Sequence, residues 1–303
     1  MDRVVKPIAC LLLGLGFAGA LALPAKASVV VVTPTSMGSW AFANMDGNNI
    51  VGANPTGSGG MVVGPATPPI GIGSANLATG NGTIGGDGSE NLSTTGYSGT
   101  QLSSLTTLTY STYDTVNNTQ QFPVLEIEIA TGLAGSDAYD QLFFEPPYQT
   151  PTTGNPSLPN QGATALDTWQ SWNVLSGGLW DNQGIAGCGS PGSGVASLSS
   201  CISAIETLGG DPTIVNTRGP GSLENVGLGG LIFFVGETNP TDQFNGNVDD
   251  FTIGVSGSDT TYDFDPTAVS GVPEPATWAM MLIGFGLVGL QLKRRNTARS
   301  FSA

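Results

Sequence analysis

Residues 124–129 read VLEIEI, a segment in which aliphatic and acidic residues alternate. Because successive side chains of a β-strand point to opposite faces, this alternation predicts an amphipathic strand. Its aliphatic residues would face a core, and Glu126 and Glu128 would lie on a solvent-exposed face. The segment therefore indicates a β-sheet protein.

Six more segments carry strand signals, at 28–33, 105–113, 142–144, 231–235, 251–255 and 262–264. Turns with Gly and Asn separate them, and residues 52–88, rich in Gly, Asn and Pro, form the loosest part of the chain. This spacing predicts a mainly β protein, a β-sandwich. Apolar residues at helical spacing between 195 and 208, ended by Gly209 and Gly210, predict one helix on the sandwich or over its edge.

Residues 1–27 have the pattern of a secretory signal peptide, with Arg3 and Lys6 before the apolar residues 8–23. The predicted cleavage site is marked by the small residues Ala25 and Ala27 and by the first residue of the mature chain, Ser28. The pattern implies the Sec translocon and signal peptidase as partners during export.

The other end of the chain, 272–295, reads VPEPATWAMMLIGFGLVGLQLKRR. As a helix, the uncharged residues 276–292 would span roughly 25 Å, near the lower limit for crossing a bilayer. A basic cluster would stop the segment and stay in the cytoplasm, leaving the rest of the chain on the other side. Its residues are Lys293, Arg294 and Arg295.

This order of motif, apolar span and basic end resembles the PEP-CTERM sorting tail in its PEPxxWA form. The residues that carry the resemblance are Pro273, Glu274, Pro275, Trp278 and Ala279. The resemblance implies that an exosortase cleaves the chain at or near the Pro-Glu-Pro motif. It also implies transient anchoring in the inner membrane and then release to the surface or polysaccharide matrix of a Gram-negative bacterium. A tail anchor that is never cleaved is the alternative.

Charge is distributed unevenly along the chain. Without the two ends, the body keeps a single basic residue, Arg218, against twenty-one Asp and Glu, which gives a net charge of about −20. Such a body repels phosphate backbones, so nucleic acid is not an expected partner.

The chain has no His. This absence excludes Ser-His-Asp and Cys-His catalysis and argues against a zinc enzyme. Glu126 and Glu128 could act as a glycosidase pair, but a solvated strand face is the preferred interpretation. We therefore expect no catalytic residues and no enzyme.

The body also resembles a concanavalin A-like, or laminin-G-like, jelly roll. The resemblance is carried by GSWAFAN at 38–44, TWQSW at 168–172, GGLW at 177–180, NGNVDDFTIG at 245–254 and TYDFDP at 261–266. It implies a β-sandwich that binds sugars or serves as a surface module.

Aromatic side chains are the candidate glycan-binding residues, because their rings stack on the apolar faces of sugars. The candidates are Tyr148, Trp169, Trp172 and Trp180. The alternative is that the tryptophans only fill the core.

Two cysteines lie in the exported body, Cys188 and Cys201. An even pair in an oxidising compartment favours a disulfide, and two buried thiols are the alternative.

In many jelly rolls an Asp near the last strands helps to hold a structural Ca²⁺. The resemblance therefore suggests Asp249 and Asp250, which follow a Gly-Asn turn, with Asp46 from the N-terminal part. The alternative is that these residues only cap their own backbone.

The sequence thus predicts three parts: a signal peptide at 1–27, a jelly-roll domain at 28–270 and a sorting and anchor segment at 271–299. The expected function is that of a non-enzymatic surface or matrix protein that holds exopolysaccharide of a biofilm. A glycan-active hydrolase and a purely structural matrix component are the alternatives.

Overall fold

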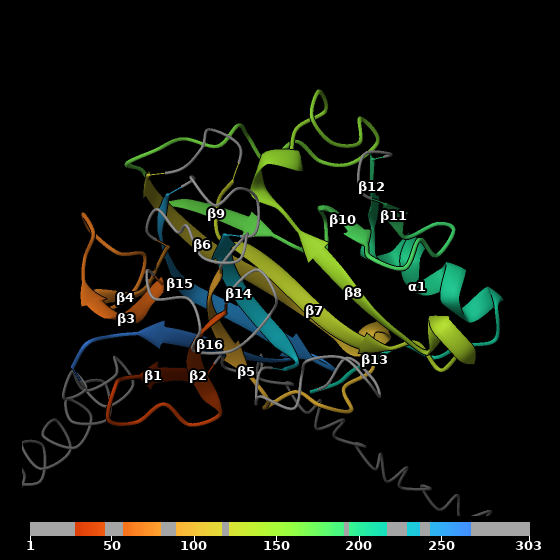
Figure 1. Ribbon diagram of the computed structural model, residues 1–303, viewed down its shortest axis with the longest axis horizontal. Coiled ribbons are helices and arrows are strands. Elements are labelled where there is room, and N and C mark those ends of the chain that lie inside the picture. The colour runs from red at the N-terminus through yellow and green to blue at the C-terminus, as the bar shows by residue number, and fades with distance from the viewer. Residues whose placement is uncertain are drawn as a thin grey trace, which may run out of the picture.

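A computed structural model describes residues 28–45, 57–79, 89–116, 121–190, 194–216, 229–236 and 243–267 (Figure 1). The described chain is mainly β, with one α-helix and three short 3₁₀ helices. The predicted signal peptide, the sorting tail and Asp46 lie outside these residues. Within them, no helix is long and apolar enough to span a membrane.

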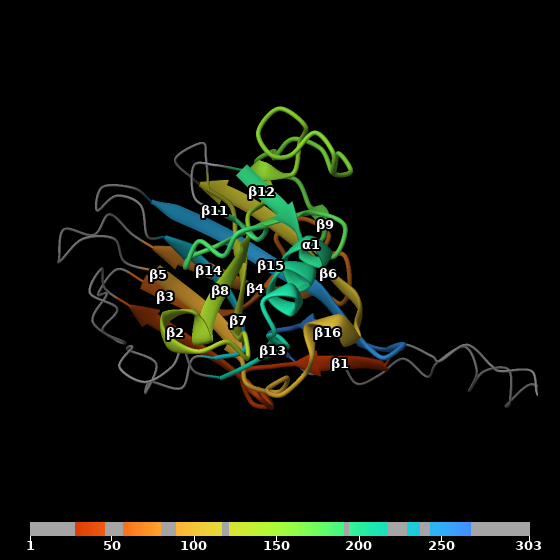
Figure 2. The same ribbon diagram turned by 90° about the vertical axis from the view of Figure 1, so that its right-hand side faces the viewer.

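The first of two sheets has seven strands, with β15 as its central member. On one edge β15 pairs with β6, and β6 pairs in turn with β9. On its other edge, the first half of β15 pairs with β4 and the second half pairs with β16. The outer strands are β3, beside β4, and β1, which runs parallel to β16 (Figure 2). The strands are β1 (Ser28–Val32), β3 (Gly57–Val63), β4 (Gly73–Thr79), β6 (Leu105–Val116), β9 (Gln170–Asn173), β15 (Phe244–Val255) and β16 (Ser258–Phe264).

The second sheet has nine strands in the order β11-β12-β10-β8-β7-β14-β5-β2, with β13 also paired to β7. Its named pairings are all antiparallel. The strands are β2 (Trp40–Met45), β5 (Ser89–Thr94), β7 (Val124–Ala130), β8 (Tyr139–Phe144), β10 (Gly178–Asp181), β11 (Gly189–Ser190), β12 (Gly194–Ser197), β13 (Thr213–Ile214) and β14 (Leu231–Gly236).

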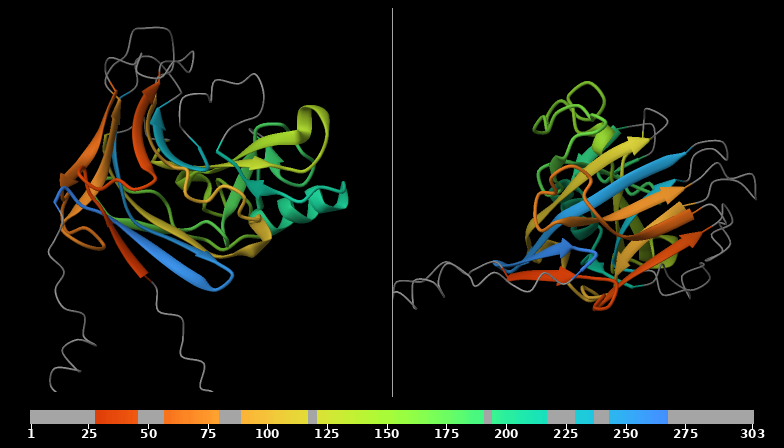
Figure 3. Two further views of the ribbon diagram at one scale, coloured as in Figure 1. Left: turned by 90° about the horizontal axis from the view of Figure 1, so that it is seen from below. Right: turned by 90° about the vertical axis from the view of Figure 1, so that its left-hand side faces the viewer.

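Aromatic residues from both sheets meet in the core between them. Trp40 of β2 stacks on Phe233 of β14, with ring centroids 6.1 Å apart. The same indole meets Phe251 and Phe264 of the other sheet edge-on, at 5.8 and 5.0 Å. Such contacts add to the stability that the buried area of the rings provides. The two layers are seen from below in Figure 3, with β3 and β4 at one end and α1 at the other.

The helix α1 (Leu198–Thr207) lies at the β12 end of the second sheet, as Figure 1 shows. Ser197 caps it, because its hydroxyl oxygen accepts a hydrogen bond from the Ser200 N–H at 3.1 Å. Leu198, Cys201 and Ile205 face the core, whereas Leu208 is 60% exposed. The predicted helix and its end at Gly209 are therefore confirmed, with Val195 placed in β12 instead.

The seven predicted strands are all present, and several are longer than the sequence signals. Two corrections concern Gly-rich segments: β3 and β4 lie inside 52–88, and the supposed Gly-Asn turn before Asp249 belongs to β15. Both are strands because their main chains pair with neighbours, which the side-chain pattern does not reveal.

The predicted solvent-exposed face of β7 is also wrong. Both faces are buried, and the side chains of Glu126 and Glu128 are 3% and 2% exposed. The reason is a second apolar cluster on the outer side of the sheet, formed by Val124, Phe143, Ile232 and Phe234.

Candidate functional site

The pairing of β8 with β10 positions Trp180. Trp180 lies opposite Phe143 in the register, and their rings stack with centroids 4.2 Å apart and planes 16° apart. The indole Nε1–H donates a hydrogen bond to Glu145 Oε1 at 2.6 Å. Trp180 is thus fixed by a stack on one face and a hydrogen bond at its edge.

The segment after β8 positions a tyrosine next to this tryptophan. Glu145 leads into the 3₁₀ helix η3 (Pro146–Tyr148), where the fixed φ of proline favours the first turn. The buried Gln149 ties this turn to β10, because its amide donates to Gly178 O at 3.0 Å and accepts from Gly178 N at 2.9 Å. Tyr148 itself remains 41% exposed.

These side chains line one pocket of about 300 Å³. Trp180, Tyr148 and Glu145 form one part of its wall, and residues of β11 and β12 form another part. The lining residues are Glu145, Tyr148, Thr153, Trp180, Ser190, Gly194 and Val195. The volume is at the lower end of the range for ligand pockets, and the lining combines aromatic rings with hydroxyl and carboxyl groups.

Glu145 is the acidic group among the residues that line the pocket. Burial raises the pKa of the Glu145 carboxyl, and the hydrogen bond from Trp180 opposes part of this shift. The charge of Glu145, followed by burial, raises the pKa of the Tyr148 hydroxyl. No Lys, Arg or His is present in the described ranges to offset Glu145.

The other two candidate tryptophans lie elsewhere. Trp172 of β9 is 1% exposed, and its Nε1–H donates to Thr112 Oγ1 at 2.8 Å in the core. Trp169 packs on Tyr113 beside the seven-stranded sheet and donates to Pro65 O at 3.0 Å. The four predicted aromatics therefore do not form one platform, and the structure brings only Tyr148 and Trp180 together.

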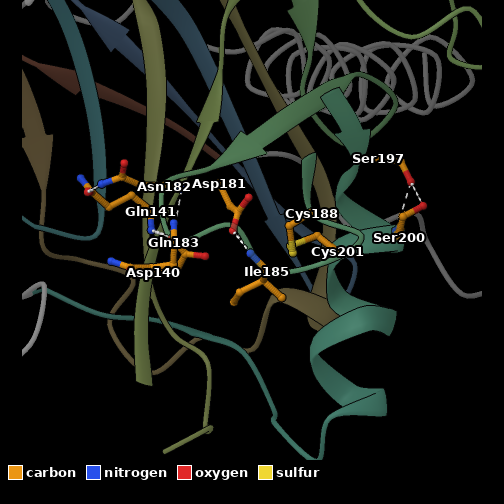
Figure 4. Close-up of a disulfide and its surroundings, with 10 residues drawn as sticks. All are labelled: Asp140, Gln141, Asp181, Asn182, Gln183, Ile185, Cys188, Ser197, Ser200 and Cys201. Atoms are coloured by element: carbon orange, nitrogen blue, oxygen red, sulfur yellow. Dashed lines mark hydrogen bonds between the residues drawn. A yellow bond between two sulfur atoms is a disulfide. The ribbon is translucent and has the colours of Figure 1, made fainter. Parts of the chain in front are cut away.

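A disulfide joins Cys188 to Cys201, the pairing expected from the sequence (Figure 4). Cys188 immediately precedes β11, and Cys201 lies on α1, which immediately follows β12. The loop before Cys188 is held as well, because the Ile185 N–H donates to Asp181 Oδ2 at 2.5 Å. The disulfide thus fastens the pocket wall that β11 and β12 form.

Glu126 and Glu128 take part in a buried polar network on the outer face of β7. The Gln141 amide donates to Glu126 Oε1 and, at 3.4 Å, to Glu128 Oε1. Its carbonyl oxygen accepts from Asn182 Nδ2 at 2.9 Å. Neither glutamate is among the residues that line the pocket.

On the other sheet, Asp249 connects two segments instead of capping a turn. It is fully buried and accepts hydrogen bonds from Phe264 N at 3.2 Å and from Ile70 N at 3.3 Å. Burial, as the leading cause, raises its pKa to about 8. Asp250 follows at a β-bulge, with a left-handed φ of 52°.

Two acidic residues that the sequence did not single out complete this acidic cluster, which we define as Asp249, Asp263 and Asp265. Asp263 Oδ1 and Asp265 Oδ2 are buried without a hydrogen-bond donor. Burial, then the charge of Asp265, raises the pKa of Asp263 to about 6. Gly71, at a φ of +64°, is required beside them, because a Cβ there would collide with the oxygens of both carboxyls.

The predicted calcium ligands are not assembled as a set. Asp46 lies outside the described residues, and both oxygens of Asp249 already accept main-chain N–H groups. Across the described ranges, no group of three or more His, Cys, Asp or Glu side chains has an arrangement ready to hold a metal ion. The buried oxygens of Asp263 and Asp265 are the feature that fits a cation best.

The main pocket residue missed from the sequence is Glu145. A local signal exists, because the segment EPPY at 145–148 puts a carboxylate one short turn before a candidate tyrosine. Asp263 and Asp265 had a signal too, because they flank Phe264 at the end of the short strand predicted at 262–264. The β11 and β12 wall had none, since two strands of two and four residues leave no periodicity.

The predicted signal-cleavage residues Ala25 and Ala27, the sorting motif and the basic stop residues lie outside the described part of the chain. A family model described as "PEP-CTERM protein-sorting motif" matches residues 271–295. No curated protein and no solved structure matches the chain. The motif indicates an exported protein that is transiently anchored in the membrane and sorted by an exosortase.

Proposed function

We propose that this protein is a non-enzymatic component of the cell surface or extracellular matrix that binds exopolysaccharide through the pocket of Trp180 and Tyr148. One observation carries the proposal. Two aromatic rings from separate parts of the chain and the carboxyl of Glu145 line a pocket of about 300 Å³. Aromatic rings beside hydroxyl and carboxyl groups are suited to the mixed apolar and polar faces of a sugar ring.

We also propose that the body is a concanavalin A-like jelly roll. Two stacked sheets with a shared aromatic core, and a mainly antiparallel pairing, support this assignment. The fold supports many activities, so the function rests on the pocket and not on the fold.

The test is a binding assay with a panel of neutral oligosaccharides, using the full-length protein in detergent micelles. Trp180→Ala should weaken binding about tenfold or more by removing one aromatic wall. Trp169→Ala is the matched control, because Trp169 is a half-buried tryptophan outside the pocket and should leave binding unchanged. Equal binding by wild type and Trp180→Ala would remove the pocket from the proposal.

Hydrolysis of the glycan panel would point to the enzymatic alternative. The variant to compare is Glu126→Gln, since Glu126 is the carboxylate that the sequence pattern offered as half of a glycosidase pair. Cleavage that this variant abolishes would replace the binding function with a hydrolase. A body that neither binds nor cleaves any glycan would leave the purely structural role.

The route to the surface is tested by fractionating cells with and without the sorting enzyme. The mature C-terminus should lose the residues after the Pro-Glu-Pro motif only when the enzyme is present. An intact tail in both fractions would make the segment a permanent anchor.

As a second proposal, Ca²⁺ stabilises the acidic cluster. The supporting observation is the pair of buried oxygens, Asp263 Oδ1 and Asp265 Oδ2, which have no donor and no neighbouring basic group in the described ranges. Oxygen ligands of this kind suit Ca²⁺. At pH 8 the melting temperature should rise with Ca²⁺ and fall with EDTA, and the double variant Asp263→Asn, Asp265→Asn should abolish this response. A melting temperature that ignores both additions would contradict it.

A further inference from the structure

We propose that the pocket selects sugars that carry a protonated amine, such as de-N-acetylated hexosamine units, over neutral and acidic sugars. This inference rests on the proposed glycan-binding function and adds the class of sugar. It starts from the position of Glu145, a half-buried carboxyl in the pocket wall next to two aromatic rings.

Glu145 has no cation to neutralise it within the described ranges, which contain no Lys, Arg or His. Its carboxylate accepts a hydrogen bond from the neutral Trp180 Nε1–H at 2.6 Å. A carboxylate removed from water is destabilised unless a positive group approaches it. A ligand ammonium group would supply that charge and would form a charge-assisted hydrogen bond.

The field of Glu145 also acts on the tyrosine of the pocket. Its charge is the leading cause of the raised pKa of Tyr148, because a negative phenolate is disfavoured near a carboxylate. The same field disfavours any other anion in this place, including the carboxylate of a uronic acid. The net charge of about −20 on the body adds a repulsion of the same sign.

The aromatic rings favour a cation as well. An ammonium group is attracted to the faces of Trp and Tyr rings, most strongly when it is shielded from water. Phe143 covers one face of Trp180 and Glu145 accepts from its Nε1–H, so the other face of the ring is left for the pocket. Trp180, Tyr148 and Glu145 thus combine two aromatic surfaces with a carboxylate, which is the chemistry that recognises an ammonium ion.

The size of the pocket limits what it can hold. A volume of about 300 Å³ suits roughly one or two sugar rings and not an extended stretch of polysaccharide. The pocket would therefore bind individual amine-bearing units along a chain, and affinity for a polymer would grow through several protein copies on one strand.

The experiment compares four probes at pH 6 by calorimetry: oligomers of glucosamine, of N-acetylglucosamine, of glucose and of glucuronic acid. The wild-type protein should bind the glucosamine oligomer at least about tenfold more tightly than the N-acetylated one, and the uronic acid oligomer least. Glu145→Gln keeps an oxygen for Trp180 Nε1–H and should remove this preference, so that the glucosamine oligomer binds no more tightly than the N-acetylglucosamine oligomer. Glu206→Gln, on the exposed side of α1, removes the same charge away from the pocket and is the matched control.

Three outcomes would overturn the inference. One is equal affinity for the glucosamine and N-acetylglucosamine oligomers, which leaves glycan binding intact and removes only the amine selectivity. The second is general charge attraction. It would be shown if Glu206→Gln weakened the amine preference as much as Glu145→Gln does, or if an oligolysine peptide bound as tightly as the glucosamine oligomer. If no oligosaccharide binds at all, the proposed glycan function fails together with the inference.

Discussion

The pocket and the acidic cluster both contain carboxyl groups without basic partners in the described chain, but they differ in access to solvent. Glu145 lies in an open pocket beside exposed aromatic surface, whereas Asp249 and Asp265 are completely buried. The oxygens of Asp249 accept main-chain N–H groups from two segments. The difference shows that an uncompensated carboxyl can serve recognition where it lines an open pocket, and can connect segments of the fold where it is buried.

Removing Asp249 should cause a large loss of stability. Asp249→Ala leaves the N–H groups of Phe264 and Ile70 without acceptors, at about 1–3 kcal/mol each, so the free energy of unfolding should fall by about 2–6 kcal/mol. Chemical denaturation measures this change. Asp249→Asn retains one acceptor oxygen and should cost clearly less; equal losses for Ala and Asn would mean that the hydrogen bonds are not the cause.

Removing the disulfide next to the pocket should lower the stability of the protein almost as much. Closing a loop with a sequence separation of 13 contributes about 3 kcal/mol. The double variant Cys188→Ala, Cys201→Ala should lose about this much stability and should also lose glycan binding, because β11 and β12 are then unfastened. The Ca²⁺ response of the acidic cluster should survive in this variant, and its loss would show that the two regions are not independent.

The stability of the protein should fall as the pH rises, because its buried carboxyls have raised pKa values in the folded state. The folded pKa is about 8 for Asp249, about 6 for Asp263 and about 7 for Asp140 and Glu90, above the ordinary values of 3.8 and 4.5. Between pH 4 and 8 the folded protein therefore binds more protons than the unfolded chain, so the free energy of unfolding decreases with pH.

Differential scanning calorimetry without Ca²⁺ should show this decrease as a melting temperature lower by about 5 °C at pH 8 than at pH 5. The variant Asp263→Asn should flatten the part of the slope near pH 6. A melting temperature that is constant or rises over this interval would contradict the assignment of protonated carboxyls to the core.

Trp180→Ala should have a smaller effect on folding than on binding. The ring is only half-buried, so the main loss is its stack on Phe143, worth about 1 kcal/mol. Trp172→Ala, in contrast, empties a core position and should destabilise by about 3–5 kcal/mol. Comparing the two by thermal unfolding separates a recognition tryptophan from a structural one.

The sequence was sufficient to predict the elements that have a clear pattern of apolar side chains. The alternation in β7 and the apolar run in β14 predicted both strands, and the helical spacing predicted α1. It failed for β3 and β4, whose Gly-rich segments become strands by pairing through the main chain. It also failed for Glu126 and Glu128, because alternation separates two faces of a strand but does not say which of them is covered.

The candidate site could be predicted only in part, for a related reason. Tyr148 and Trp180 are 32 positions apart in the sequence, and the register of β8 with β10 brings them to one pocket. Trp169 and Trp172 are closer in sequence to Trp180 than Tyr148 is, yet they lie at the other sheet. Residue type identified the candidates, and the pairing of strands decided which of them meet.

Hydrogen–deuterium exchange with and without a saturating polysaccharide tests the central claim most directly, because it compares the two regions in one experiment. The account predicts slower exchange in 145–153 and 194–197, which border the pocket, and unchanged exchange in 70–73 and 258–264 at the acidic cluster. Protection at the acidic cluster, or none at the pocket under conditions where the polysaccharide is bound, would contradict it.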